Sequence, residues 1–150
     1  SFADRIDKLT SLSVKEGESG DKIEAGHAIV APGGMHTLFH VSKTENSYHT
    51  IRLQKHKGKK ELEPSIDRAM LSASEVFGKH AIGIVLTGMG NDGMEGMRAI
   101  KEAGGHTIVQ DPDTAVVGSM PQAVIDEGLA DQILAPNKIA ARLIKLVGHS

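Results

Sequence analysis

The sequence predicts an α/β protein: a doubly wound, mostly parallel sheet with helices on both faces and a β-hairpin insertion. Three observations lead to this class. From Pro64 onward, short branched apolar runs alternate with segments of helical periodicity. Before that point the pattern is short, alternating and strand-like. The 150 residues, 39% hydrophobic and 24% charged, also have the size and composition of one globular domain.

The second half supplies the alternating units. Helices are predicted over residues 64–78, 94–105 and 120–128, with a last helix beginning at Asn137-Lys138. The intervening runs at 81–86, 106–111 and 130–136 are predicted strands. Strand, helix, strand in this order favours right-handed parallel crossovers, and the sequence leaves the order of the strands open.

The first half opens on a helical pattern that places Phe2, Ile6 and Leu9 on one face. Residues 27–32 form an apolar run stopped by Pro-Gly-Gly. Residues 36–43 and 47–54 alternate around Thr44-Glu45-Asn46, which predicts the hairpin. The basic stretch at 52–60 is predicted to be a solvated edge or loop and is only a weak candidate for a binding surface.

Composition excludes several classes of site. Without cysteine there is no disulfide, thiolate nucleophile or thiolate metal site. The net charge of -2 gives no reason to expect nucleic acid. No run is long enough to span a bilayer and no signal peptide is visible, so we expect a cytoplasmic protein without membrane insertion. The eight histidines lack a helical H-x-x-x-H pair, and we expect neither a metal nor a cofactor.

Other candidate residues are weaker. GESGD (17–21) lies among charges in a predicted turn, and the chain contains no G-x-S-x-G elbow. His36 and His40 follow a strand pattern, which favours a structural or surface role.

The loop LTGMGNDGMEGM (86–97) allows two chemical interpretations. Gly88, Gly90 and Gly93 have the spacing of a dinucleotide-binding turn, and Asp111 follows 18 positions later, near where a ribose-binding acid is expected. Asp92 opposes this interpretation, because a carboxylate there would repel a phosphate. In a parallel sheet this loop and residues 108–121 are expected side by side, beyond the carboxyl ends of two strands.

A purely structural role for Asp92 is also open. Asp before a helix commonly accepts from the first backbone N–H groups and stabilises the helix by about 1 kcal/mol. On spacing alone, this role is favoured over a catalytic one.

Several segments together resemble the CheB-type protein-glutamate methylesterases, the chemotaxis receptor methylesterases. They are SFADRID, GHAIVAPGGMH, PSIDRAMLSASEVFG, LTGMGNDGMEGM, QDPDTAVVGSMPQAVIDEG and ADQIL, in family order over nearly the whole chain. The family's Gly-Met-Pro segment here reads GSMP, with Ser119 between Gly118 and Met120.

The resemblance implies a reaction. Such enzymes hydrolyse γ-methyl esters of glutamate on the cytoplasmic helices of methyl-accepting chemoreceptors, releasing methanol, and many deamidate receptor glutamines. They use Ser, His and Asp on an α/β sheet, without a cofactor. Asp92 matches the family aspartate, which holds the histidine tautomer and stabilises its imidazolium. Met89 matches the family methionine whose backbone N–H is expected to help form an oxyanion hole.

The sequence departs from the family in one respect. The Gly-Ala-Ser-Thr-Gly-Gly type turn that carries the nucleophile, and the histidine after it, have no counterpart in the 150 residues. We therefore expect residues 1–150 to be a methylesterase-like catalytic domain lacking its first strand–helix segment, with a receiver (response-regulator) domain in the parent protein. This chain alone is expected to be inactive and to expose an apolar sheet edge. A non-catalytic regulatory relic of the fold is the remaining alternative.

Overall fold

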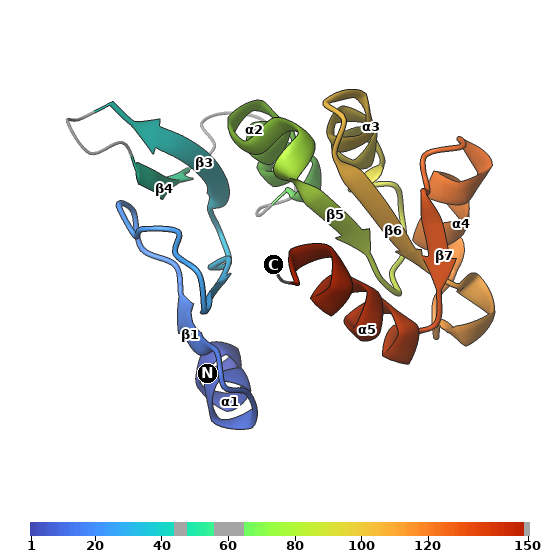
Figure 1. Cartoon of the computed structure of the whole chain (residues 1–150), viewed down its shortest axis with the longest axis horizontal. Helices are drawn as coiled ribbons and strands as arrows, with labels where there is room; N and C mark the ends of the chain where they lie inside the picture. The colour runs from blue at the N-terminus through green and yellow to red at the C-terminus, as the bar shows by residue number, and fades with distance from the viewer. Residues whose placement is uncertain (44–47, 56–64, 149–150) are drawn as a thin grey trace.

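A computed structural model of the chain describes residues 1–43, 48–55 and 65–148. Figure 1 shows the arrangement of its helices and strands. The helices are α1 (Phe2–Leu9), α2 (Ile66–Phe77), α3 (Met94–Glu102), α4 (Ser119–Asp126) and α5 (Pro136–Val147), with 3-10 turns η1 (Gly78–His80) and η2 (Pro112–Thr114). The strands are β1 (Ser13–Glu16), β2 (His27–Val30), β3 (His36–Ser42), β4 (Tyr48–Gln54), β5 (Ile82–Val85), β6 (His106–Gln110) and β7 (Gln132–Leu134).

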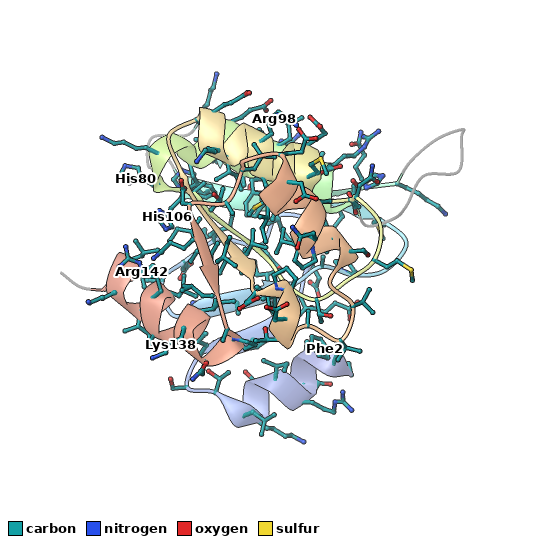
Figure 2. The ribbon with its side chains drawn as sticks, turned by 90° about the vertical axis from the view of Figure 1, so that its right-hand side faces the viewer. Phe2, His80, Arg98, His106, Lys138 and Arg142 are labelled. Atoms are coloured by element: carbon teal, nitrogen blue, oxygen red, sulfur yellow. The ribbon has the colours of Figure 1, made fainter. Side chains whose placement is uncertain are left out.

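The second half forms a three-stranded parallel sheet of order β5-β6-β7. Ile84 pairs with Ile108 and Val109 with Ile133, so the carboxyl ends of the strands meet at one edge. Figures 1 and 2 show α3 and α5 on opposite sides of this sheet, with α2 beside α3. The predicted alternation of parallel strands and helices on both faces is therefore confirmed.

The first half contains the predicted hairpin and a separate parallel pair. Strands β3 and β4 are antiparallel, with Phe39 opposite Ile51. Strands β1 and β2 are parallel, with Val14 opposite Ala28. The parallel strands thus lie in two sheets. The predicted turn at Thr44-Glu45-Asn46 and the basic stretch beyond Lys55 lie outside the described residues.

The main core lies between β5, β6 and the helices of one face. It consists of Val85, Met97, Val109, Met120, Val124 and Leu129, with Met70 and Met94 packed against it. Helix α3 approaches α2 closely because residue 96 is glycine: a Cβ there would lie 2.5 Å from the Met70 Cβ. Glycine is needed at this position to bring the two helices together.

The β5 edge of the three-stranded sheet is open. Strand β5 pairs with β6, and no strand within the described ranges pairs with its other edge. A groove of about 310 Å³ lies between β3, α2 and β5. Its lining is mostly apolar: Ala31, Thr37, Phe39, Ser65, Ile66, Ala69, Met70, Ala73, Ile82 and Ile100. A mostly apolar groove therefore lies beside the open edge of β5.

Helix α1 differs from expectation in what it buries. Phe2 and Leu9 are 59% and 81% exposed, whereas Ala3 is 3% exposed. Two residues of the predicted apolar face are therefore exposed, and the third, Ile6, is half-buried. Figure 2 labels Phe2 on α1.

A polar cluster lies at the end of the sheet opposite the loop at residues 86–97. Gln132 Oε1 accepts a hydrogen bond from Arg142 Nε at 2.8 Å and lies 2.9 Å from His106 Nε2. Figure 2 shows His106 and Arg142 close together there. Asp131 accepts from Thr107 N–H at 2.9 Å and from Lys101 Nζ at 2.7 Å.

Among the helices of the described segments, none has the length and apolar character to cross a membrane.

Candidate functional site: two helix starts joined by carboxylates

The first turn of α2 has every backbone N–H group bonded. Ser65 is its N-cap, and the Ser65 hydroxyl accepts from Arg68 N–H at 3.3 Å. Ser65 N–H itself donates to His36 Nδ1 at 3.2 Å. The N–H groups of Ile66 and Asp67 donate to a carboxylate from another part of the chain. Helix starts need such acceptors because their first N–H groups have no partner within the helix.

That carboxylate belongs to Asp92. Its Oδ2 accepts from Ile66 N–H at 2.8 Å, and its Oδ1 accepts from Asp67 N–H at 3.0 Å. The Ser65 hydroxyl donates to the same Oδ1 at 3.3 Å. The half-buried Asp92 side chain is therefore held at the positive end of α2, where a negative charge is stabilised.

The N-cap role considered for Asp92 on its own helix is wrong. Gly93 is the N-cap of α3 and makes no side-chain cap. Gly93 has φ +113°, a left-handed conformation that glycine adopts without strain. This turn separates Asp92 from α3, and the Asp92 carboxylate caps α2 instead.

Asp67, in the first turn of α2, in turn contacts the start of α3. Its Oδ1 accepts from Gly93 N–H and from Gly96 N–H, both at 2.8 Å. These are N–H groups of the α3 start. Asp92, in the loop before α3, thus caps α2, and Asp67, in the first turn of α2, caps α3.

The beginning of the loop is hydrogen-bonded to β6 and to the segment before α4. Thr87 N–H donates to Gln110 Oε1 at 2.9 Å, and Gly88 N–H donates to Val117 O at 2.9 Å. Gln110 is 5% exposed, and its amide nitrogen lies 3.3 Å from both Thr114 O and Thr114 Oγ1. The two loops at the carboxyl ends of β5 and β6 therefore lie side by side, as the sequence predicts.

The other predicted residues occupy different environments. Met89 is 79% exposed, at the tip of the loop. Asp111 accepts from Asp113 N–H at 3.0 Å and caps the 3-10 turn η2. Ser19 accepts from Leu53 N–H at 2.8 Å, which makes it part of the packing beside the hairpin.

The α3 start is a poor place for a dinucleotide pyrophosphate. In a nucleotide-binding turn, the N–H groups at the helix start bind phosphate oxygens. Here Gly93 N–H and Gly96 N–H already donate to Asp67, and the Asp92 carboxylate is adjacent. A phosphate would have to displace one carboxylate and approach another. The geometry therefore argues against the nucleotide-binding alternative.

The histidines that the sequence suggested as structural have packing roles. His36 is fully buried, and its Nδ1 accepts from Ser65 N–H. A neutral imidazole that accepts at Nδ1 carries its proton on Nε2. His40 Nε2 lies 3.2 Å from an Arg52 nitrogen on the hairpin. Within the described part of the chain, no group of three or more His, Cys, Asp or Glu could hold a metal ion.

Two residues of the site were missed from the sequence. Asp67 looks like an ordinary acid in the first turn of a helix, and Gln110 looks like the polar end of a strand. Their partners lie 26 and 23 positions away. No local signal distinguishes them, because their function depends on which elements pack together.

The arrangement can hold one acid rigidly at the edge of a sheet. Asp92 has three donors on the α2 side, and its loop is fixed by Asp67 and Gln110. Such a carboxylate could orient and stabilise a cationic partner such as a histidine.

Known proteins share this architecture. Residues 1–143 match the family model described as CheB methylesterase. The crystal structure of the Thermotoga maritima CheB methylesterase catalytic domain superposes with a TM-score of 0.88 at 37% identity, covering 97% of this chain and 75% of that one.

Curated relatives are similar over almost all of the chain. A protein-glutamate methylesterase/protein-glutamine glutaminase of Geobacter sulfurreducens is 38% identical over 98% of this chain and 39% of its own length. One from Nitratidesulfovibrio vulgaris is 40% identical over 95% of this chain and 38% of its own length. The chain thus spans about two-fifths of these relatives. On its sequence, its architecture and the match over residues 1–143, the chain belongs to the CheB methylesterase family.

Proposed function

We propose that the protein is a protein-glutamate methylesterase that also deamidates glutamine. It would hydrolyse the γ-methyl ester of a glutamate side chain, so that water is consumed and methanol and a carboxylate are formed. The names of its relatives support this activity. The observation that carries the proposal is the fixing of Asp92 by three hydrogen bonds at the carboxyl edge of the sheet.

In this mechanism Asp92 orients a histidine and stabilises its imidazolium. The histidine takes the proton of a serine hydroxyl as the serine oxygen attacks the ester carbonyl, and then gives that proton to the departing methoxide. Water hydrolyses the resulting acyl-enzyme. The backbone N–H of Met89 contributes to the oxyanion hole that stabilises the tetrahedral intermediate.

The serine and the histidine come from a segment outside these 150 residues. Two observations support this. A quarter of the solved Thermotoga domain has no counterpart in the chain. The open edge of β5 and the groove beside it also offer unpaired backbone and apolar surface. A strand from that segment would pair with this edge and bring its side chains toward Asp92.

The partners follow from the substrate. They are the cytoplasmic helices of methyl-accepting chemoreceptors and a receiver domain in the parent protein, which would place the protein in the cytoplasm. The receiver domain is compatible with the roughly three-fifths of each relative that lies beyond the matched region.

Methanol release from methylated receptor, measured with the complete protein, tests the proposal. Asp92→Asn is expected to lower kcat by roughly 10²–10⁴-fold, because the histidine loses its orienting acid. The 150-residue chain alone is expected to release none. Near wild-type turnover by Asp92→Asn would refute the orienting role, and an inactive complete protein would favour the regulatory relic.

A titration with NAD and ATP separates the nucleotide-binding alternative. We expect no saturable binding, because Asp67 and Asp92 place two carboxylates at the start of α3. Saturable binding that Asp92→Asn strengthened would support the alternative, since that change removes a charge that repels phosphate.

A further inference from the structure

Asp67 makes two short hydrogen bonds that both end on the segment carrying Asp92. Gly93 N–H and Gly96 N–H each lie 2.8 Å from the same oxygen, Asp67 Oδ1. The Asp67 side chain is half-buried between α2 and α3. Gly93 directly follows Asp92, so Asp67 holds the backbone one residue from the proposed catalytic acid.

The close approach of the helices makes this contact possible. An aspartate side chain is short, and it reaches α3 only because Gly96 has no Cβ to separate the helices at Met70. Gly93 meanwhile needs its left-handed turn to send Asp92 toward α2. Without Asp67, two N–H groups at the α3 start would lose their acceptor and the turn would lose its anchor on α2.

We infer that Asp67 is a positioning residue: it sets the place of the Asp92 carboxylate by fixing Gly93 and the start of α3. This inference rests on the proposed methylesterase function. Asp67 touches neither substrate nor the reacting atoms in this scheme; it acts through Asp92. Small displacements of a catalytic group lower turnover more than binding, because they act on the geometry of the transition state.

Two variants of the complete protein separate geometry from charge. Asp67→Ala removes the acceptor, whereas Asp67→Asn keeps a side-chain oxygen that can accept from Gly93 and Gly96. We expect Asp67→Ala to lower kcat roughly 10–100-fold while KM changes less than about twofold. Asp67→Asn is expected to recover most of the loss.

Asp131→Ala is the matched control. Asp131 also accepts a backbone N–H, from Thr107, but at the opposite end of β6. This variant should lose stability as well, with kcat close to wild type. If kcat of Asp67→Ala is equal to that of Asp131→Ala, or if Asp67→Asn is as impaired as Asp67→Ala, the positioning role is refuted.

Hydrogen–deuterium exchange tests the same inference without activity. In Asp67→Ala, the amides of the segment 91–97 should exchange several-fold faster than in wild type, and in Asp131→Ala they should not. Unchanged exchange at Gly93 and Gly96 would overturn the inference. If the wild-type protein releases no methanol, the proposed function fails, while the exchange result still decides whether Asp67 anchors the loop.

Discussion

Asp92, in the loop before α3, caps the start of α2, and Asp67, in the first turn of α2, caps the start of α3. The Asp92 carboxylate accepts from Ile66 N–H and Asp67 N–H at the start of α2, and the Asp67 carboxylate accepts from Gly93 N–H and Gly96 N–H at the start of α3. Each carboxylate therefore lies at the positive start of a helix, where its negative charge is stabilised. These two caps fix the loop at residues 86–97 relative to α2.

Because Asp92 and Asp67 cap neighbouring helix starts, we predict that the two aspartates are energetically coupled. Asp92→Ala and Asp67→Ala should each lower the free energy of unfolding by about 1–2 kcal/mol, the cost of losing helix-capping acceptors. The double variant should cost at least about 0.5 kcal/mol less than the sum, because either single change already loosens the shared junction. Urea unfolding of the four proteins measures the cycle.

The control for this cycle is the pair Asp92 and Asp131, which share no partner. Their changes should add within about 0.5 kcal/mol. If Asp92 and Asp67 also add within that range, the two caps act independently.

Gly96→Ala should destabilise the protein. In an exposed helix, replacing glycine with alanine stabilises by about 1 kcal/mol. Here the new Cβ would lie 2.5 Å from the Met70 Cβ, so α3 must move away from α2. We expect a net loss of about 1–3 kcal/mol in thermal or urea unfolding. A stabilised variant would mean that the helices do not touch at this position.

Gln110→Glu should loosen the loop from the β6 side. The carboxylate could still accept from Thr87 N–H, but the donor contacts to Thr114 would be lost and a charge would be buried. We expect a loss of about 1–3 kcal/mol in the free energy of unfolding. The control is Gln122→Glu at an exposed position of α4, which loses a surface hydrogen bond to Asp126 but buries no charge and should cost less than about 1 kcal/mol. Equal effects would contradict a role for Gln110 as the tie.

Asp131 should make stability depend on pH. Desolvation raises the pKa of Asp131, but hydrogen bonds from Lys101 and Thr107 outweigh it and leave the pKa below its ordinary value of 3.8. Because the folded pKa is the lower one, ionised Asp131 stabilises the fold above the unfolded pKa. That contribution is lost as pH falls through the folded pKa.

Unfolding of wild type and Asp131→Asn between about pH 7 and pH 2 measures this contribution. Wild type should be the more stable at neutral pH, and the difference should shrink below about pH 4. A difference that stays constant over this range would show that the charge of Asp131 contributes nothing.

Periodicity and chain order were enough to predict most elements. The helix stop near Gly104, the strands at 82–85 and 106–110 and the pairing of β3 with β4 all follow local patterns that the structure confirms. The burial of α1 did not follow its pattern: Phe2 is exposed and Ala3 is buried. Periodicity identifies a helix face, but it does not show whether another element packs against that face.

The sequence by itself determined the α/β class, the family and the position of Asp92 at the end of a parallel strand. These depend on short-range periodicity and on residues contiguous in the chain. Only the tertiary structure decided what Asp92 contacts. Its capping partner is α2 rather than the adjacent α3, and Asp67 and Gln110 hold its loop from 26 and 23 positions away. Helix-start N–H groups bind whichever acceptor packing brings to them, so these partners depend on the fold.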